Sequence, residues 1–106
     1  STMSTSTREA QFRVTVDFDI TKVSCVTYGA SAAIQLDERV ATTPQTAGTN
    51  ILSAALTCTT SGAATQTFSN RFITQEAFVN LQITNAQPGV ARPTMLEVHI
   101  FGEKVQ

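Results

Sequence analysis

The sequence predicts an all-β domain: an antiparallel β-sandwich of the jelly-roll or immunoglobulin-like kind, with about seven or eight strands. Several segments alternate apolar and polar residues with period two, which is typical of strands that bury one face. Turn residues recur about every ten positions, and no long stretch has the period of an amphipathic helix. A barrel is the alternative architecture.

The strongest strand signal lies at 12–20, where apolar residues alternate with polar ones without a break. A helix would scatter these apolar side chains around its circumference, whereas a strand places all of them on one face. Thr21 and Lys22 interrupt the alternation, so we expect the strand to end there and a second one to begin at Val23.

The other expected strands are separated by turns rich in Gly, Pro, Asn and Thr. They lie at 23–28, 30–40, 51–58, 67–73, 79–84 and 94–101. Two longer polar loops, 41–50 and 85–93, connect them. In the segment 74–78, Thr74 either caps one helical turn or makes a polar bend, and the sequence leaves both open.

A single domain with one core is expected at 9–106, because a chain of 106 residues has room for only one. Residues 1–8 show no apolar periodicity, so we expect a flexible arm that is ordered only when a neighbour holds it. The inter-sheet core is expected to contain Phe12, Val14, Val16, Phe18, Leu56, Leu81, Ile83, Val98 and Ile100.

The two cysteines, Cys25 and Cys58, both fall in expected strands, so a bridge across the sandwich is geometrically conceivable. The sequence begins without an apolar signal segment, and Cys58 closes an apolar run in which a thiol acts as a small core residue. We therefore expect two buried free thiols.

The composition excludes two classes of partner. Seven Lys and Arg oppose eight Asp and Glu, so the chain lacks the basic excess that binding to nucleic acid requires. No apolar run reaches the length of a membrane span, and no membrane partner is expected. Thr alone accounts for 18 residues. A polar surface with so few charges suits a protein that is packed in an assembly.

The sequence offers no catalytic or metal site. His99 is the only histidine, and it shares a strand face with Glu97, which we interpret as a solvated or interface pair because nothing supplies an oxyanion hole. Asp17 and Asp19 lie about 6 to 7 Å apart on one strand face, too far to chelate one ion without a third group. A calcium site there is the less favoured interpretation. We expect no enzymatic activity, no cofactor and no metal.

Three segments carry a resemblance to a known group of proteins. They are GTNILSAALTCTTSG at 48–62, TQTFSNRFITQEAFVNLQIT at 65–84 and MLEVHIFGEKV at 95–105. Together they resemble the small β-sandwich virion proteins of tailed bacteriophages, in which a Gly-Thr-x-Ile-Leu strand, a Val-x-Leu-x-Ile strand, a Pro/Gly loop and a last strand ending in Gly follow one another. The resemblance spans about residues 12 to 105.

This resemblance implies a non-enzymatic structural protein, in particular a head decoration (cement) protein that stabilises the capsid by binding neighbouring subunits. It implies a homo-oligomer, commonly a trimer, with major capsid or other virion proteins as partners, made in the host cytoplasm and located in the virion. The alternative is a carbohydrate- or receptor-binding module of a tail fibre or adhesin, for which Tyr28 is the main aromatic candidate in a chain without Trp. A pilin-like surface subunit is a third class, which would need a donor strand and export.

Assembly contacts are expected on the three segments without core-forming periodicity, 1–8, 41–50 and 85–93. Their polar side chains are available to hydrogen-bond a neighbouring subunit, whereas the sandwich serves as a rigid mount. The candidate contact residues are Thr5, Thr7, Arg8, Thr43, Gln45, Thr49, Gln87 and Arg92.

Overall fold

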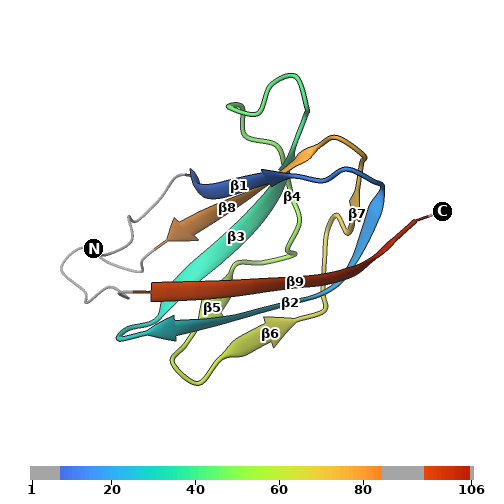
Figure 1. The fold of residues 1–106 in the computed structure, drawn as a ribbon. Helices are drawn as coiled ribbons and strands as arrows, with labels where there is room; N and C mark the ends of the chain where they lie inside the picture. Colours follow the sequence, from blue (N-terminus) through green and yellow to red (C-terminus); the bar gives the residue numbers. More distant parts are fainter. Residues whose placement is uncertain (1–7, 85–94, 106) are drawn as a thin grey trace.

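The computed structural model describes residues 8–84 and 95–105, which form two antiparallel sheets packed face to face (Figure 1). The predicted antiparallel β-sandwich is confirmed. Its strands are β1 (Arg8–Arg13), β2 (Phe18–Tyr28), β3 (Ala32–Arg39), β4 (Thr49–Asn50), β5 (Leu56–Cys58), β6 (Ala63–Thr65), β7 (Phe72–Ile73), β8 (Phe78–Thr84) and β9 (Met95–Lys104). The described residues contain no helix that is long and apolar enough to cross a membrane.

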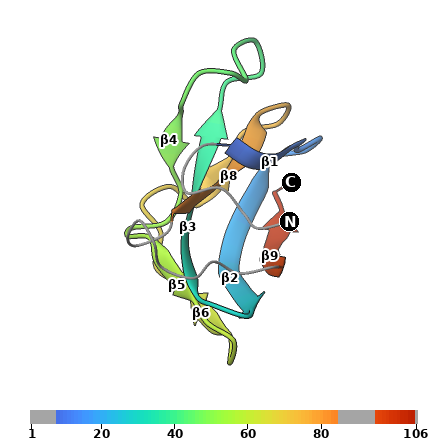
Figure 2. The ribbon, with the colours of Figure 1, turned by 90° about the vertical axis from the view of Figure 1, so that its left-hand side faces the viewer.

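The first sheet has the order β1-β8-β3, and the short strands β4 and β5 both pair with the far side of β3. The second sheet is built on β2, which pairs with β9 along one side and with β6 and β7 along the other. Among the described residues, β1 and β9 are therefore edge strands of different sheets. Both lie on the same side of the sandwich, as the view along the layers shows (Figure 2).

The expected strand at 12–20 is wrong as a single element. β1 ends at Arg13 and pairs with β8 in the first sheet, whereas β2 begins at Phe18 in the second sheet. The chain changes sheets at 14–17, where the Val14 amide donates to the carbonyl oxygen of Ala77 at 3.0 Å. Alternation continues through this corner because a strand that crosses between sheets keeps the same interior on one side. The pattern therefore placed Val14, Phe18 and Ile20 correctly against the core, and it missed the corner.

The expected break at Thr21 and Lys22 is also wrong, because β2 continues through both residues. The pairing with β9 shifts register between Ile20 and Lys22, as at a β-bulge. Before the bulge the buried residue is even-numbered, Ile20, and after it the buried residues are odd-numbered, Val23 and Cys25, because the extra residue shifts the alternation by one position. A bulge in a continuous strand therefore produced the interruption in the alternation.

Two other expected strands are shorter than the pattern suggested. In the run 51–58 only Leu56–Cys58 is a strand, and Leu52 forms an isolated bridge with Phe68. In the run 67–73 only Phe72–Ile73 is a strand. Of the segment 74–78, residues 74–77 form a turn, closed by a 3.0 Å hydrogen bond from the Ala77 amide to the carbonyl oxygen of Thr74, and Phe78 begins β8.

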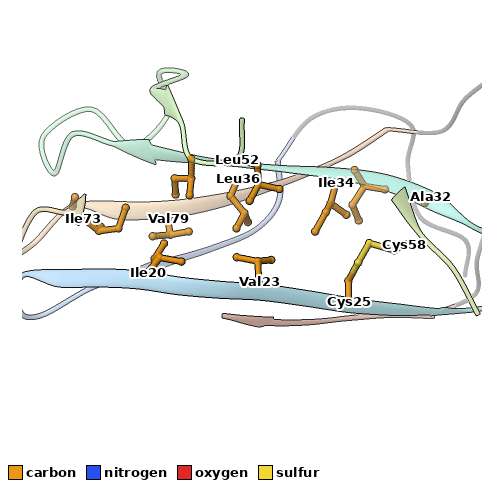
Figure 3. Packing of buried hydrophobic residues seen from close by; sticks show 13 residues of the cluster. Ile20, Val23, Cys25, Ala32, Ile34, Leu36, Leu52, Cys58, Ile73 and Val79 are labelled. Atoms are coloured by element: carbon orange, nitrogen blue, oxygen red, sulfur yellow. A yellow bond between two sulfur atoms is a disulfide. The ribbon is translucent and has the colours of Figure 1, made fainter. Parts of the chain in front are cut away.

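The core lies between β2 and the first sheet, where buried side chains from both layers point toward one another (Figure 3). Of the residues expected there, Ile83 is fully buried, and Val14, Phe18, Leu56, Leu81, Val98 and Ile100 are half-buried and pack against the core. Phe12 is 50% exposed, so its expected place in the core is wrong. Val16 is half-buried and lies outside the cluster. The fully buried members include Ile20, Val23, Ile34, Leu36, Ile51, Leu52, Cys58 and Ile73.

The expectation of free thiols is wrong, because Cys25 and Cys58 form a disulfide. Cys25 on β2 and Cys58 at the end of β5 face each other across the two sheets, with their Cα atoms 5.5 Å apart (Figure 3). Both are buried. A buried free thiol and a buried disulfide have the same apolar surroundings, so the sequence pattern could not distinguish them. The packing of β2 against β5 does, because it brings the two cysteines together.

Candidate assembly surface

The loop after β3 is attached to the outer face of the first sheet. Along β3, Ile34 and Leu36 point into the core, so Asp37 and Arg39 lie on the opposite face. Nevertheless, Asp37 is 1% exposed and Arg39 6% exposed. A buried ion pair on an outer face means that neighbouring groups cover that face at this end of the sheet.

The Asp37 carboxylate accepts four hydrogen bonds. Its Oδ2 accepts from Arg39 Nε at 2.8 Å and from the Gly48 backbone amide at 2.9 Å. Its Oδ1 accepts from the side-chain Nδ2 of Asn80 at 2.9 Å and from the side-chain Nε2 of Gln82 at 3.3 Å. One buried side chain thus joins β3, β8 and the end of the loop that leads into β4.

Two further features hold this loop against β3. Arg39 Nη1 donates to the carbonyl oxygen of Pro44 at 3.2 Å, which ties the middle of the loop to the same ion pair. At Gly48, a side chain would collide with the carbonyl oxygen of Glu38, so only glycine allows the loop to lie so close to β3. The base of the loop is therefore fixed at both ends and in the middle.

The structure brings three of the predicted contact residues together. Thr43 and Gln45 are exposed on this loop, and Thr49, also exposed, opens β4 opposite Glu38. Arg8 opens β1 and pairs with Gln82, so it lies on a different strand of the same sheet. Thr5, Thr7, Gln87 and Arg92 lie outside the described residues, as do the expected contact segment 85–93 and most of the arm.

A second candidate surface, which the sequence analysis missed, is the open side of the sandwich between β1 and β9. Two adjoining apolar grooves of about 280 and 150 Å³ lie there. Their walls share Phe12, Val79 and Ile100, and the larger groove is also lined by Leu36, Leu81, Leu96 and Val98. Alternation placed these side chains on the inner face, but it does not show that no described element covers the sheets along this side, where Phe12 is 50% exposed.

The outer face of the second sheet carries the only histidine. His99 Nε2 lies 3.4 Å from Glu97 Oε1, as expected for two residues on one strand face. The Tyr28 hydroxyl donates to Glu97 Oε2 at 3.0 Å, and this hydrogen bond, together with the charge of Glu97, raises the pKa of Tyr28 above its ordinary value of 10.0. All three side chains are exposed, so these are contacts between polar groups on the surface.

The two aspartates considered for a calcium site are used in structural contacts. Asp17 accepts from the backbone amide of Gln75 at 2.7 Å, and Asp19 forms an ion pair with Arg71 at 2.8 Å. Within 8–84 and 95–105, no group of three or more His, Cys, Asp or Glu side chains could hold a metal ion.

Comparison of the chain with protein-family models, curated proteins and solved structures gave no significant match.

Proposed function

We propose that the protein is a non-enzymatic structural protein that acts by binding neighbouring subunits in a particle. In its most specific form the proposal is a head decoration (cement) protein of a tailed bacteriophage, located in the virion, with the major capsid protein or other virion proteins as partners. The observation that carries it is the polar loop at 40–48, whose base is fixed by the Asp37 network while Thr43 and Gln45 remain exposed.

A loop fixed in this way favours binding. Ordering a free loop on association costs entropy, and a loop that is already held in one conformation avoids most of that cost. The loop presents short uncharged side chains, among them Thr42, Thr43 and Thr46, which can hydrogen-bond a partner without the desolvation cost of charged groups. The sandwich below it supplies a rigid support.

The sequence supports the same proposal. The resemblance to small β-sandwich virion proteins implies a homo-oligomer, commonly a trimer, and a Thr-rich surface with few charges suits a protein that is surrounded by other subunits. The segment that precedes β1 is a further expected contact, because its polar side chains show no core-forming periodicity.

The proposal can be tested on particles from the phage that encodes the chain. Antibodies against the chain are expected to label the heads of purified particles. Labelling at the tail tip would instead support the alternative, a receptor- or carbohydrate-binding module, for which the 46% exposed Tyr28 beside Met95 is the structural candidate. Particles without any label would contradict both.

We predict that two changes weaken binding to particles from which the chain has been removed. Deleting residues 1–7, which leaves β1 intact, or combining Thr43→Ala with Gln45→Ala is expected to raise the Kd by about tenfold, as lost interfacial hydrogen bonds do. Isothermal titration against depleted particles measures this Kd. Thermal melting is expected to be unchanged, because the altered loop side chains are exposed.

Ser61→Ala is the matched control, since Ser61 is an exposed polar turn residue near the other end of β3. If the loop variant binds as tightly as the Ser61 variant, the loop is not a contact. If the chain without residues 1–7 binds as tightly as the full chain, these residues do not contact the particle.

A further inference from the structure

Among the described strands, β9 has a long edge that is unpaired and carries little of the usual protection. β9 pairs with β2 from Met95 to Lys104, and no other strand among the described residues pairs with its outer edge. Edge strands normally avoid association through prolines, bulges or inward-pointing charges. β9 has no proline, the bulge lies on β2, and the inward residues Leu96, Val98, Ile100 and Gly102 are uncharged, with Lys104 at the end of the strand the only charged residue on this face.

The edge of β9 also borders the apolar grooves. Leu96, Val98 and Ile100 are only half-buried by their own chain, and they line the larger groove together with Phe12. A free backbone edge beside uncovered apolar side chains has the properties of a site for β-strand addition. The residues of β9 itself indicate which strand would pair with this edge.

The sequence of β9 is complementary to itself about Val98. In an antiparallel pair of two β9 strands centred on Val98, Glu97 lies opposite the partner's His99, and His99 opposite the partner's Glu97. On the same face Met95 lies opposite the partner's Phe101, a favourable contact between sulfur and an aromatic ring. On the inner face Leu96 lies opposite the partner's Ile100.

Neighbouring registers lose this complementarity. A shift by two residues places Glu97 opposite the partner's Glu97 in one direction and His99 opposite the partner's His99 in the other. A shift by one residue would oppose inward and outward side chains, which turns the apolar face of one copy to the wrong side. The register centred on Val98 is the one that matches both faces.

From this self-complementary edge, we propose that the chain forms a two-fold dimer in which β9 pairs antiparallel with β9 of a second copy. The two-fold axis passes beside Val98, perpendicular to the sheet, so the second sheets of the two copies form one continuous sheet. The uncovered apolar grooves, including the half-exposed Phe12 of each copy, then face each other across the axis. The inference deepens the proposed assembly function by naming the chain itself as one partner.

The register can be tested by exchanging charges on the isolated chain. His99→Glu places like charges opposite each other at two symmetric positions, and the dimer Kd is expected to rise about tenfold. Adding Glu97→His again places a glutamate opposite a histidine at both positions, with the two residue types exchanged. The double variant is therefore expected to dimerise like the parent. Sedimentation equilibrium measures the Kd of each. Thr57→Glu, which adds a carboxylate on an exposed position of β5 at the far edge of the first sheet, is the control and is expected to have no effect.

Crosslinking tests the same register without relying on charge. Mixing a Glu97→Cys variant with a His99→Cys variant is expected to give a disulfide-linked dimer under mild oxidation, and to give more of it than either variant alone. Both side chains are exposed, so neither variant is expected to alter folding.

A chain that is monomeric at millimolar concentration would overturn the proposal, as would a trimer or a dimer whose Kd is indifferent to the charge exchange. None of these outcomes would contradict binding to the particle through the loop at 40–48, which is measured separately. Conversely, a β9 dimer that binds no particle would support this interface and contradict the virion function.

Discussion

Asp37→Ala is expected to lower the free energy of unfolding by about 3 to 5 kcal/mol, the range found when one partner of a buried ion pair is removed. The substitution leaves the Arg39 guanidinium buried without its carboxylate. It also removes the acceptor from the Gly48 amide and from the side-chain amides of Asn80 and Gln82. Urea denaturation followed by circular dichroism measures the loss.

Two controls separate the buried ion pair from a general effect of charge. Asp19→Ala breaks the more exposed ion pair with Arg71 and is expected to cost about 1 kcal/mol or less. Combining Asp37→Ala with Arg39→Met is expected to recover part of the loss, because no buried charge is then left alone. If Asp37→Ala proves no more destabilising than Asp19→Ala, the carboxylate does not hold the loop as described.

Hydrogen exchange gives a local view of the same substitution. In the parent, the Gly48 amide is bound to Asp37 Oδ2 and is expected to exchange slowly. In the Asp37→Ala variant this amide and its neighbours in the loop are expected to exchange faster at temperatures where the sheets are still protected. Weaker binding to the particle is then expected as well, because the loop has lost its fixed conformation.

Replacing both cysteines by alanine is expected to lower the free energy of unfolding by about 3 to 4 kcal/mol, the value for a bridge that closes a loop of this size. The bridge joins residues 33 positions apart and holds β5 in the first sheet against β2 in the second. Alkylation without reductant, in denaturant, is expected to label neither Cys25 nor Cys58 in the parent, and mass spectrometry detects this directly.

Adding a reductant to the parent provides the matched experiment, since it opens the bridge without changing a residue. Reduced parent and double variant are expected to unfold at similar denaturant concentrations. Labelling of both thiols in the untreated parent would contradict the disulfide and restore the expectation of free thiols.

Much of the sandwich could be predicted because one physical signal dominates a half-buried strand. Alternation identified β3, β8 and β9 within a few residues, and it placed Ile34, Leu36 and Ile83 correctly on the inner face. Alternation failed where different backbone structures give the same sequence pattern. A strand that turns a corner between sheets keeps its alternation, as at 14–17, and a bulge breaks the alternation without ending the strand, as at Thr21.

The candidate surfaces were less predictable because they depend on which elements meet. Gly, Pro and Asn marked the loop at 41–50, so Thr43 and Gln45 could be proposed as contacts. Nothing in the sequence showed that Asp37 lies under this loop, since an acidic residue in a strand usually faces solvent. The exposure of Phe12 likewise depends on the absence of a described strand between β1 and β9, which is a property of the topology.

The crossing of the chain between the sheets has a mechanical consequence. The chain passes from one layer to the other at 14–17, 29–31, 59–62 and 74–77, and the Cys25–Cys58 bridge adds a covalent link between β2 and β5. A force that pulls the two layers apart is therefore borne by covalent bonds at several separated points, and the hydrophobic interface does not carry it alone. Under such a load the weakest parts are the hydrogen bonds within each sheet, so the domain is expected to yield by peeling an edge strand such as β1 while its layers stay together.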